Sequence, residues 1–377
     1  MVLLGYSIEE VAYKMYTLYA DDQLIYSPDY LEENLMIENP YYEKESNKAG
    51  SCQFVIFNTN PYYDQIKPLK TSITVKENGK DVWYGRVLNT SNDFNNRKTV
   101  YCEGMLSFFC DSIIRPYEFE SKTLQEMFNY YLAAHNSQVE YWKQVTVKKF
   151  DVEDIYGAKK WESTGYKNTK DVINELVEDY GGYLIFERDA EKKINYLSYV
   201  KQPDIPSSNQ EIEFGDNLLN VTDAINPENI YTCLIPIGYD SEGNKITIES
   251  VNHGQDYIES KIGVERYGKV FNEYTYDMDI SSPQELLEKA KATLEKQIEE
   301  ARTITVKAFD KHLLDPEHII PIDVYSILKV NSDPHNIHEN QMCTKIKINM
   351  DDPADSEFTI GALPTSIADI IAKQQSK

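Results

Sequence analysis

The chain has 377 residues, of which 62 are acidic and 38 basic, so its formal net charge is −24 and its pI is near 4.7. This acid excess argues against a nucleic-acid-binding surface, because phosphate binding needs clustered Lys and Arg; a wall that repels DNA and an ordinary solubilising charge both fit it. A hydrophobic fraction of 41% is enough for ordinary cores, and no run approaches the ~18 apolar residues that span a membrane.

The first 15 residues precede the first regular pattern and are read as an N-terminal extension. Met1–Tyr6 lacks a basic start and is followed by Glu9-Glu10, which is not the composition of a secretory signal. We therefore expect the protein to be made and assembled in the cytoplasm. The extension is either a docking helix or the stretch before an alternative start at Met15.

Residues 16–104 are predicted to form a first β-domain. Phe54 and Ile56 belong to a run of strand-forming residues with a period of two, and turn residues break the run. Asn78-Gly79 tolerates the positive φ angles that a type I′ turn needs at both central positions. A two-residue hairpin is therefore predicted to return through Val82, Trp83 and Tyr84.

Residues 105–201 are predicted to form an α+β domain. Thr123-Leu124-Gln125-Glu126 has the form of a capping box. A second helix, from about Thr169 to Tyr180, ends at Gly181-Gly182, where positive φ has no steric cost. Strands are expected at 183–187 and 194–200. The apolar faces of the helices are Leu124, Met127, Phe128, Tyr131 and Leu132 in the first and Val172, Ile173, Leu176, Val177 and Tyr180 in the second.

The rest of the chain is predicted to form a second β-domain, residues 202–250 and 303–362, interrupted by a helix-containing insertion domain, residues 251–302. Residues 203–208 read as a linker because of their Pro and Ser content. Ser282-Pro283-Gln284-Glu285 opens a long helix with Ser as N-cap. Strands are expected at 230–237, 245–251, 303–309, 323–330, 343–350 and 357–360, before a C-terminal tail at 363–377. The fold class is α+β and β-rich, a multidomain chain with two small β-barrel-like domains and two α+β domains.

The residues point to no catalytic group, metal site or cofactor. The sequence contains no HExxH, no GxSxG and no phosphate-binding glycine loop. His335 and His338, with His318 and Cys343 near them, are the best zinc-like cluster, but they lie in a stretch that reads as a polar loop. The five cysteines are widely spaced without CxxC, so free buried thiols are expected. The many acidic residues make any single pair of carboxylates uninformative about glycoside hydrolysis.

Several segments together resemble the prophage endopeptidase tail family, the phage tail-associated lysins. They follow one another in family order between roughly Tyr16 and Gly361, and none is a catalytic signature by itself. The segments are Asn47–Val87, Cys102–Phe119, Asn136–Val139, Asp171–Leu184, Ile212–Thr222, Ser250–Ile258, the Tyr267-Gly268 pair, Ile304–Asp315 and Lys347–Gly361.

The resemblance implies a structural protein similar to the trimeric baseplate hub of contractile phages. Such a homotrimer closes the tail tube at the virion tail tip, presents six similar β-modules to a six-fold tail, and opens for DNA ejection. Its implied partners are the distal tail protein, the tape measure protein and a separate fibre, receptor-binding or lysin protein. Longer relatives continue into a lysin region, whereas only a short tail follows Gly361 here, so hydrolytic activity is not carried over.

Two other function classes stay open, a cell-wall hydrolase with an unmarked pair of carboxylates and a protein that binds host-wall carbohydrate. The 29 tyrosines occur partly as adjacent pairs, which suit interfaces and cores alike. The residues we expect at an interface are Tyr62, Tyr63 and Trp83.

Overall fold

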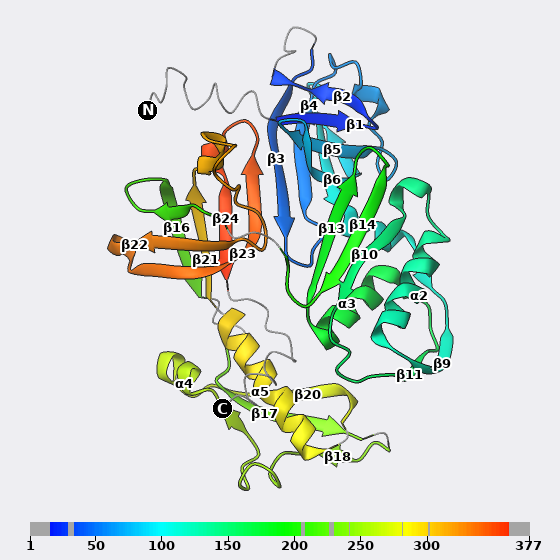
Figure 1. Cartoon of the computed structure of the whole chain (residues 1–377), viewed down its shortest axis with the longest axis vertical. Coiled ribbons are helices and arrows are strands. Elements are labelled where there is room, and N and C mark those ends of the chain that lie inside the picture. The colour runs from blue at the N-terminus through cyan, green and yellow to red at the C-terminus, as the bar shows by residue number, and fades with distance from the viewer. Residues whose placement is uncertain are drawn as a thin grey trace. The chain divides into compact units, whose positions relative to one another are not determined.

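The structure is a computed structural model that describes residues 16–28, 34–204, 208–225, 230–240, 242–280, 282–300 and 302–361. The described residues form two compact units, one within Met1–Val221 and Thr305–Ile360 and one within Thr222–Ile304. The β-rich, multidomain α+β class is confirmed (Figure 1). The boundaries of the six segments that were predicted from the sequence remain a prediction. The extension 1–15, the tail 363–377 and residues 205–207 of the linker lie outside the described residues.

One sheet of 13 strands holds most of the β-structure, in the order β16-β21-β24-β23-β3-β4-β7-β6-β5-β1-β2, with β22 paired to β23 and β15 paired to β22. Strands from both predicted β-domains therefore share one sheet. The strands are β1 Tyr16–Ala20, β2 Gln23–Tyr26, β3 Ile37–Glu45, β4 Ser51–Ile56, β5 Ser72–Glu77, β6 Lys80–Asn92, β7 Lys98–Gly104, β15 Glu211–Glu213, β16 Leu218–Ile225, β21 Arg302–Ala308, β22 Ile327–Ser332, β23 Ile337–Asn349 and β24 Glu357–Gly361.

The antiparallel pair β3–β23 joins the early and late parts of this sheet. Lys345 lies opposite Glu45 and Lys347 lies opposite Glu43, so opposite charges face each other across the two strands. The Lys345 ammonium also lies 3.3 Å from a carboxylate oxygen of Glu43. Such cross-strand charge pairs favour this register, because a slip of one residue would move every side chain to the other face.

The hairpin predicted at Asn78-Gly79 and the strand predicted around Phe54 and Ile56 are both confirmed. Asn78 and Gly79 have φ of 47° and 81°, as a type I′ turn requires, and Glu77 pairs with Lys80. Phe54 and Ile56 point from β4 into the core and are fully buried.

The α+β part of the first unit packs two helices beside a three-stranded sheet, in which β10 and β14 are parallel and β13 is antiparallel to β14 (Figure 1). Its elements are a 3₁₀-helix Met105–Asp111, β8 Ile113–Ile114, β9 Tyr117–Lys122, α2 Leu124–Asn136, β10 Val145–Asp151, β11 Lys159–Ser163, β12 Lys167–Asn168, α3 Thr169–Tyr180, β13 Tyr183–Asp189 and β14 Ile194–Val200.

Both predicted helices of this part are confirmed. The Thr123 hydroxyl accepts from the Glu126 amide, and the Glu126 carboxylate accepts from the Thr123 amide, which completes the capping box. Helix α3 stops at Gly181, where φ is 69°. All five predicted apolar residues of α2 are buried, as are Val172, Ile173, Leu176 and Tyr180 of α3, while Val177 is half-buried against the same core.

The second unit packs α5 Pro283–Glu300 on a small sheet of β17 Cys233–Tyr239, β18 Lys245–Ile246, β19 Ile258–Glu259 and β20 Phe271–Asp279, with α4 Lys261–Tyr267 before β20. The predicted N-cap is confirmed, because the Ser282 hydroxyl accepts from the Glu285 amide at 3.2 Å. The predicted stripe Leu287, Ala290, Leu294 and Ile298 is buried. Ala301 lies outside the described residues.

Four strand predictions were wrong in extent. The strand expected at 230–237 begins three residues later, at Cys233, and the strand expected at 343–350 begins six residues earlier, at Ile337. The strand expected at 245–251 is only β18, because a turn follows Ile248. The strand expected from Asp323 begins at Ile327, because Tyr325 has φ of 75° in a turn closed by the Ser326 amide on the Asp323 carbonyl. Among the described residues, every helix is too short or too polar to cross a membrane.

Candidate interaction sites

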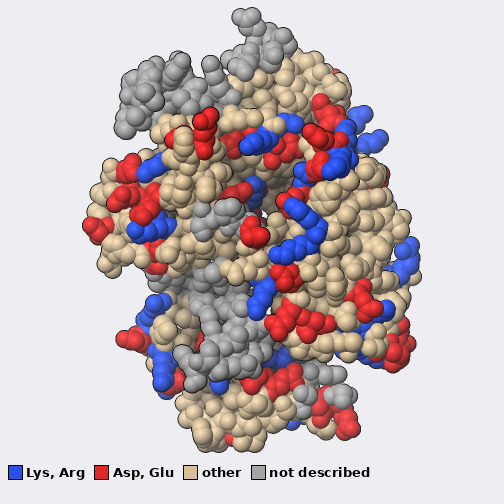
Figure 2. Space-filling view, in the orientation of Figure 1, with Lys and Arg blue, Asp and Glu red and all other residues tan. Residues whose placement is uncertain are grey.

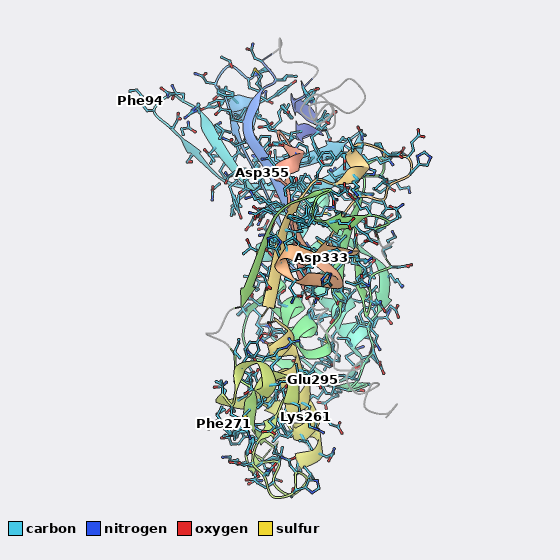
Figure 3. The ribbon with its side chains drawn as sticks, turned by 90° about the vertical axis from the view of Figure 1, so that its left-hand side faces the viewer. Phe94, Lys261, Phe271, Glu295, Asp333 and Asp355 are labelled. Carbon is cyan, nitrogen blue, oxygen red and sulfur yellow. The ribbon has the colours of Figure 1, made fainter. Side chains whose placement is uncertain are left out.

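The hairpin of β6 and β7 ends in a polar tip, residues 93–97, that carries one large apolar side chain. Phe94 is 101% exposed, and it projects at the end of the hairpin (Figure 3). Asp93 organises the tip, since its carboxylate accepts from the amides of Asn95 and Arg97 at 2.8 and 2.9 Å and from Arg97 Nε at 2.7 Å. The hairpin tip is therefore ordered by its own hydrogen bonds.

The predicted interface residues Tyr62 and Tyr63 lie near the tip end of the same hairpin, where β7 begins at Lys98. The Lys98 ammonium donates to the Tyr63 carbonyl and lies 3.8 Å from the centre of the Tyr63 ring. Burial lowers the pKa of Lys98. The Tyr62 hydroxyl donates to Gln23 Oε1 at 3.2 Å, and both tyrosines are half-buried. The structure therefore brings the tyrosine pair next to the hairpin, which sequence patterning did not indicate.

Trp83, the third predicted interface residue, is 5% exposed and packs inside its own chain. Its ring lies where a side chain on Gly85 would be, 2.5 Å from the Cβ position, and 3.8 Å from the Cβ position of Gly104. Trp83 is thus almost completely buried against the sheet, whereas Tyr62 and Tyr63 are half-buried.

A cavity of about 490 Å³ lies beside Trp83 in the first unit. Aliphatic and aromatic side chains line it together with charged side chains of both signs. The lining residues are Lys44, Glu45, Lys48, Ala49, Asp81, Val82, Trp83, Tyr84, Gly104, Met105, Leu106, Leu184, Ile185, Phe186, Glu187, Arg188, Asp323, Val324 and Tyr325.

The charged groups at this cavity are paired locally. Lys44 Nζ lies 2.7 Å from Asp323 Oδ2, and the Arg188 guanidinium lies 3.6 Å from the centre of the Tyr84 ring. Acidic and basic side chains are also interspersed on the face drawn in Figure 2. Such a surface fits a protein contact better than binding to a phosphate backbone.

A second, small cavity of about 30 Å³ is lined by two carboxylates of the first unit, the buried Asp310 and the half-buried Glu77. Burial raises the pKa of both groups, and for Glu77 the nearby His312 opposes this. Asp310 accepts from Gln210 Nε2 at 2.6 Å and from the Ile322 amide at 2.8 Å. The cavity has room for about one water molecule, so a sugar ring does not fit between these two carboxylates.

The residues weighed as a zinc cluster do not converge. His335 Nδ1 lies 2.6 Å from the Ser332 hydroxyl, and His318 Nδ1 lies 2.8 Å from Asp315 Oδ1. Cys343 is buried, which raises the pKa of its thiol. Across the part of the chain that the structure describes, three or more His, Cys, Asp or Glu side chains nowhere gather as they would around a metal ion.

The expected burial of the cysteines is confirmed for four of the five, Cys52, Cys102, Cys233 and Cys343. For Cys110 it was wrong, since this residue is exposed. Cys110 lies near the end of the 3₁₀-helix Met105–Asp111, in which residues 106–109 are buried and Cys110 and Asp111 are exposed, so the apolar run SFFC does not form a buried strand.

Comparison with known proteins identifies the fold. Residues 206–371 match the family model described as prophage endopeptidase tail. The chain is similar to the crystal structure of a 43 kDa tail protein of prophage MuSo2 from Shewanella oneidensis, with a TM-score of 0.64, 13% identity, and coverage of 93% of this chain and 99% of that one. Among curated protein sequences, none is similar enough to count as a match.

Two further solved structures are similar. A tail protein from Neisseria meningitidis MC58 has a TM-score of 0.64 and 11% identity, covering 94% of this chain and 99% of that one. Prophage tail protein gp18 from Listeria monocytogenes EGD-e has a TM-score of 0.53 and 15% identity, covering 90% and 92%. The chain thus has the fold of prophage tail proteins, and its residues 206–371 carry the sequence pattern of the prophage endopeptidase tail family.

Proposed function

We propose that this protein is a structural component of a phage tail, a hub at the tail tip in which three copies form a ring. The observation that carries the proposal is the extent of the similarity. Fold similarity to the three tail proteins spans 90% to 94% of this chain and 92% to 99% of theirs, so it is not limited to one shared module.

In this role the protein acts through its contacts with other tail proteins. The ring closes the end of the tail tube, contacts the distal tail protein and the tape measure protein, holds a separate fibre, receptor-binding or lysin protein, and opens when DNA is ejected. The net charge of −24 supports passage of DNA without binding. Assembly takes place in the host cytoplasm, and the finished position is the virion tail tip.

Tyr62 and Tyr63 are proposed to contribute to contacts with a neighbour, because both residues are only half-buried and lie near the exposed hairpin tip. Trp83 acts indirectly, as a buried support of the cavity wall. The ring itself is not encoded by a coiled coil, since no heptad run is present in the sequence.

Light scattering on the purified protein across a dilution series tests the ring. One chain has a mass of 43.6 kDa, and the proposal predicts a species of three chains that dissociates only on dilution. A monomer at every concentration, with no assembly when the distal tail protein is added, would contradict it.

A second candidate, a cell-wall hydrolase, is favoured by one observation, the word endopeptidase in the description of the matching family. It requires a pair of reactive groups in an accessible cleft. The test is release of soluble fragments from purified peptidoglycan by the pure protein. Sustained turnover would support the hydrolase, whereas complete inactivity at high protein concentration would leave the structural role.

A further inference from the structure

The cavity of about 490 Å³ lies between two strand edges that lack a partner strand among the described residues. Residues 81–84 of β6 pair with β5 on one side only, because the pairing of β6 with β7 begins at Gly85. Strand β13 lies at the edge of its sheet and pairs with β14. Residues 81–84 and 184–188 both line the cavity. Two backbone edges of the kind that accept a further strand therefore flank it.

Side chains bridge the two edges at both ends of the cavity. At one end the Leu184 amide donates to Asn47 Oδ1 at 2.8 Å, and the Tyr325 hydroxyl donates to the Leu184 carbonyl at 3.4 Å. At the other end Arg188 Nη1 donates to Thr74 Oγ1 at 3.2 Å. From Leu184 to Arg188 a strand rises about 13 Å, at about 3.3 Å per residue. The gap therefore has the length of about four residues of extended chain.

Polar groups in this gap lack hydrogen-bond partners. Backbone groups of alternate strand residues point the same way, so those of Phe186 point away from β14, as those of Leu184 do, and no described residue bonds them there. Within the described part of the chain no group forms a hydrogen bond to either buried oxygen of Asp81, although the Lys76 ammonium lies 3.0 Å from Oδ1. An extended polypeptide supplies both the N–H and the C=O groups that such a site needs.

The chain that precedes β1 enters the fold beside this gap. Tyr16 pairs with Glu77, and Glu77 pairs with Lys80 across the hairpin turn. Two strand spacings of about 4.8 Å separate Tyr16 from Lys80, and Lys80 directly precedes Asp81 of the cavity. The 15 residues before Tyr16 span up to about 50 Å when extended. The gap is therefore well within their reach.

The composition of these residues suits a strand followed by a tether. Met1–Tyr6 has no charged side chain and no proline, and its Val and Tyr favour strands. Residues 7–15 contain three charged side chains. The cavity offers Val82 and Phe186 to the apolar side chains of such a strand and backbone groups to its peptide units.

We propose that residues 1–6 fill this cavity of their own chain as an added strand between β6 and β13. The same chain supplies the occupant because a tethered segment has an effective concentration in the millimolar range, whereas a segment of a second copy also loses the entropy of association. A docking helix would leave the gap unsatisfied, since a helix bonds its own backbone groups. The inference does not depend on the proposed ring.

Hydrogen exchange tests the added strand. The full chain is compared with a chain that starts at Met15. The Phe186 and Arg188 amides should exchange at least about tenfold faster in the shortened chain, because they lose the added strand. The Leu184 amide is the internal control, since Asn47 binds it in both chains. Equal exchange of Phe186 in the two chains overturns the proposal.

A substitution in the full chain keeps this test valid if the shortened chain does not fold by circular dichroism. Leu3→Asp places a charge in the apolar run and should speed exchange of Phe186 in the same way. Ser7→Asp, which adds the same charge outside the run, should leave that exchange unchanged. Equal effects of the two substitutions contradict the added strand.

Photo-cross-linking identifies the occupant. A benzophenone analogue of phenylalanine replaces Leu4 in the full chain, and the same analogue at Tyr166, which is 73% exposed in the same unit, is the control. The expected product is an intrachain link from position 4 to residues 82–84 or 185–187, which the control does not give. An interchain link to this wall assigns the strand to a second copy and overturns the proposal. Links that lie only outside the wall overturn it as well.

Discussion

At the scale of single residues, the nearly buried Arg86 of β6 forms an ion pair with Asp111 of the 3₁₀-helix and so links the first β-strands to the α+β part. The Arg86 side chain is 3% exposed and also donates to the Ser107 carbonyl at 3.2 Å. Burial would raise the pKa of Asp111, but Arg86 and Lys143 outweigh it and lower that pKa below its usual value. Asp111 thus pairs with two nearly buried cations, Arg86 and Lys143. Glu140 supplies Lys143 with a second carboxylate.

Replacing Asp111 with alanine should lower the free energy of unfolding by about 3 kcal/mol, because it leaves Arg86 buried without its counterion. Chemical denaturation measures the change. The matched control is Glu175→Ala, which removes an exposed ion pair with Lys167 and should change stability by less than about 1 kcal/mol. Equal effects of the two substitutions would contradict the assignment.

Asp351 makes the stability of the fold depend on pH with the opposite sign to that of Asp111, because its pKa is raised in the folded chain and that of Asp111 is lowered. Burial, with a smaller contribution from Glu38, raises the pKa of Asp351 to about 6 in the folded chain, above its unfolded value of roughly 3.9. The folded state therefore binds the proton more tightly, and ionised Asp351 destabilises the fold above pH 6. Asp351→Asn should raise the melting temperature at pH 7.5, and the gain should vanish as the pH falls from 6 towards 4. A gain that persists at pH 4 would show that charge is not the cause.

At the scale of elements, helix α2 begins where its capping box was expected, so the box is a local property of Thr123 and Glu126. Thr123→Ala should cost about 0.5–2 kcal/mol in unfolding free energy. Thr123→Ser, which keeps the hydroxyl, should cost clearly less. Similar losses for both variants would mean that the threonine methyl group, and not the cap, is responsible.

The β6–β7 pair depends on a close approach that only glycine allows. A Cβ on Gly85 would lie 2.0 Å from the Glu103 carbonyl oxygen and 2.5 Å from the Trp83 ring. Gly85→Ala should therefore destabilise the chain by about 1–3 kcal/mol or more. Gly165→Ala is the control, since nothing lies within 4 Å of its Cβ position. Thermal unfolding of the two variants distinguishes strain from a general effect of losing glycine.

The elements themselves were largely predictable from the sequence, but their arrangement was not. Helical spacing and caps identified α2, α3 and α5, and the Asn78-Gly79 turn identified a hairpin, because each of these signals is local. The pairing of β3 with β23 depends on residues far apart in sequence, which no periodicity encodes. The cavity and the contact between Tyr63 and Lys98 depend on the same long-range packing.

At the scale of the whole molecule, charge opposes assembly. Each chain carries a net charge of −24, and exposed charges are screened over about 10 Å at 0.1 M salt but over about 30 Å at 0.01 M. Self-association should therefore strengthen as salt rises from 10 to 200 mM, with a larger three-chain fraction in sedimentation at fixed protein concentration. Weakening over this range would mean that ion pairs between chains dominate.

The junction of β3 with β23 also has a consequence for biosynthesis. Lys44 and Asp323, which pair beside this junction, are 279 residues apart. A ribosome that adds about 5–20 residues per second takes on the order of 15–60 s to cover that distance. During this time the edge of β3 has no partner strand, and unpaired edges are templates for aggregation. Nascent chains that stop before residue 337 should therefore depend on chaperones more than the finished protein does.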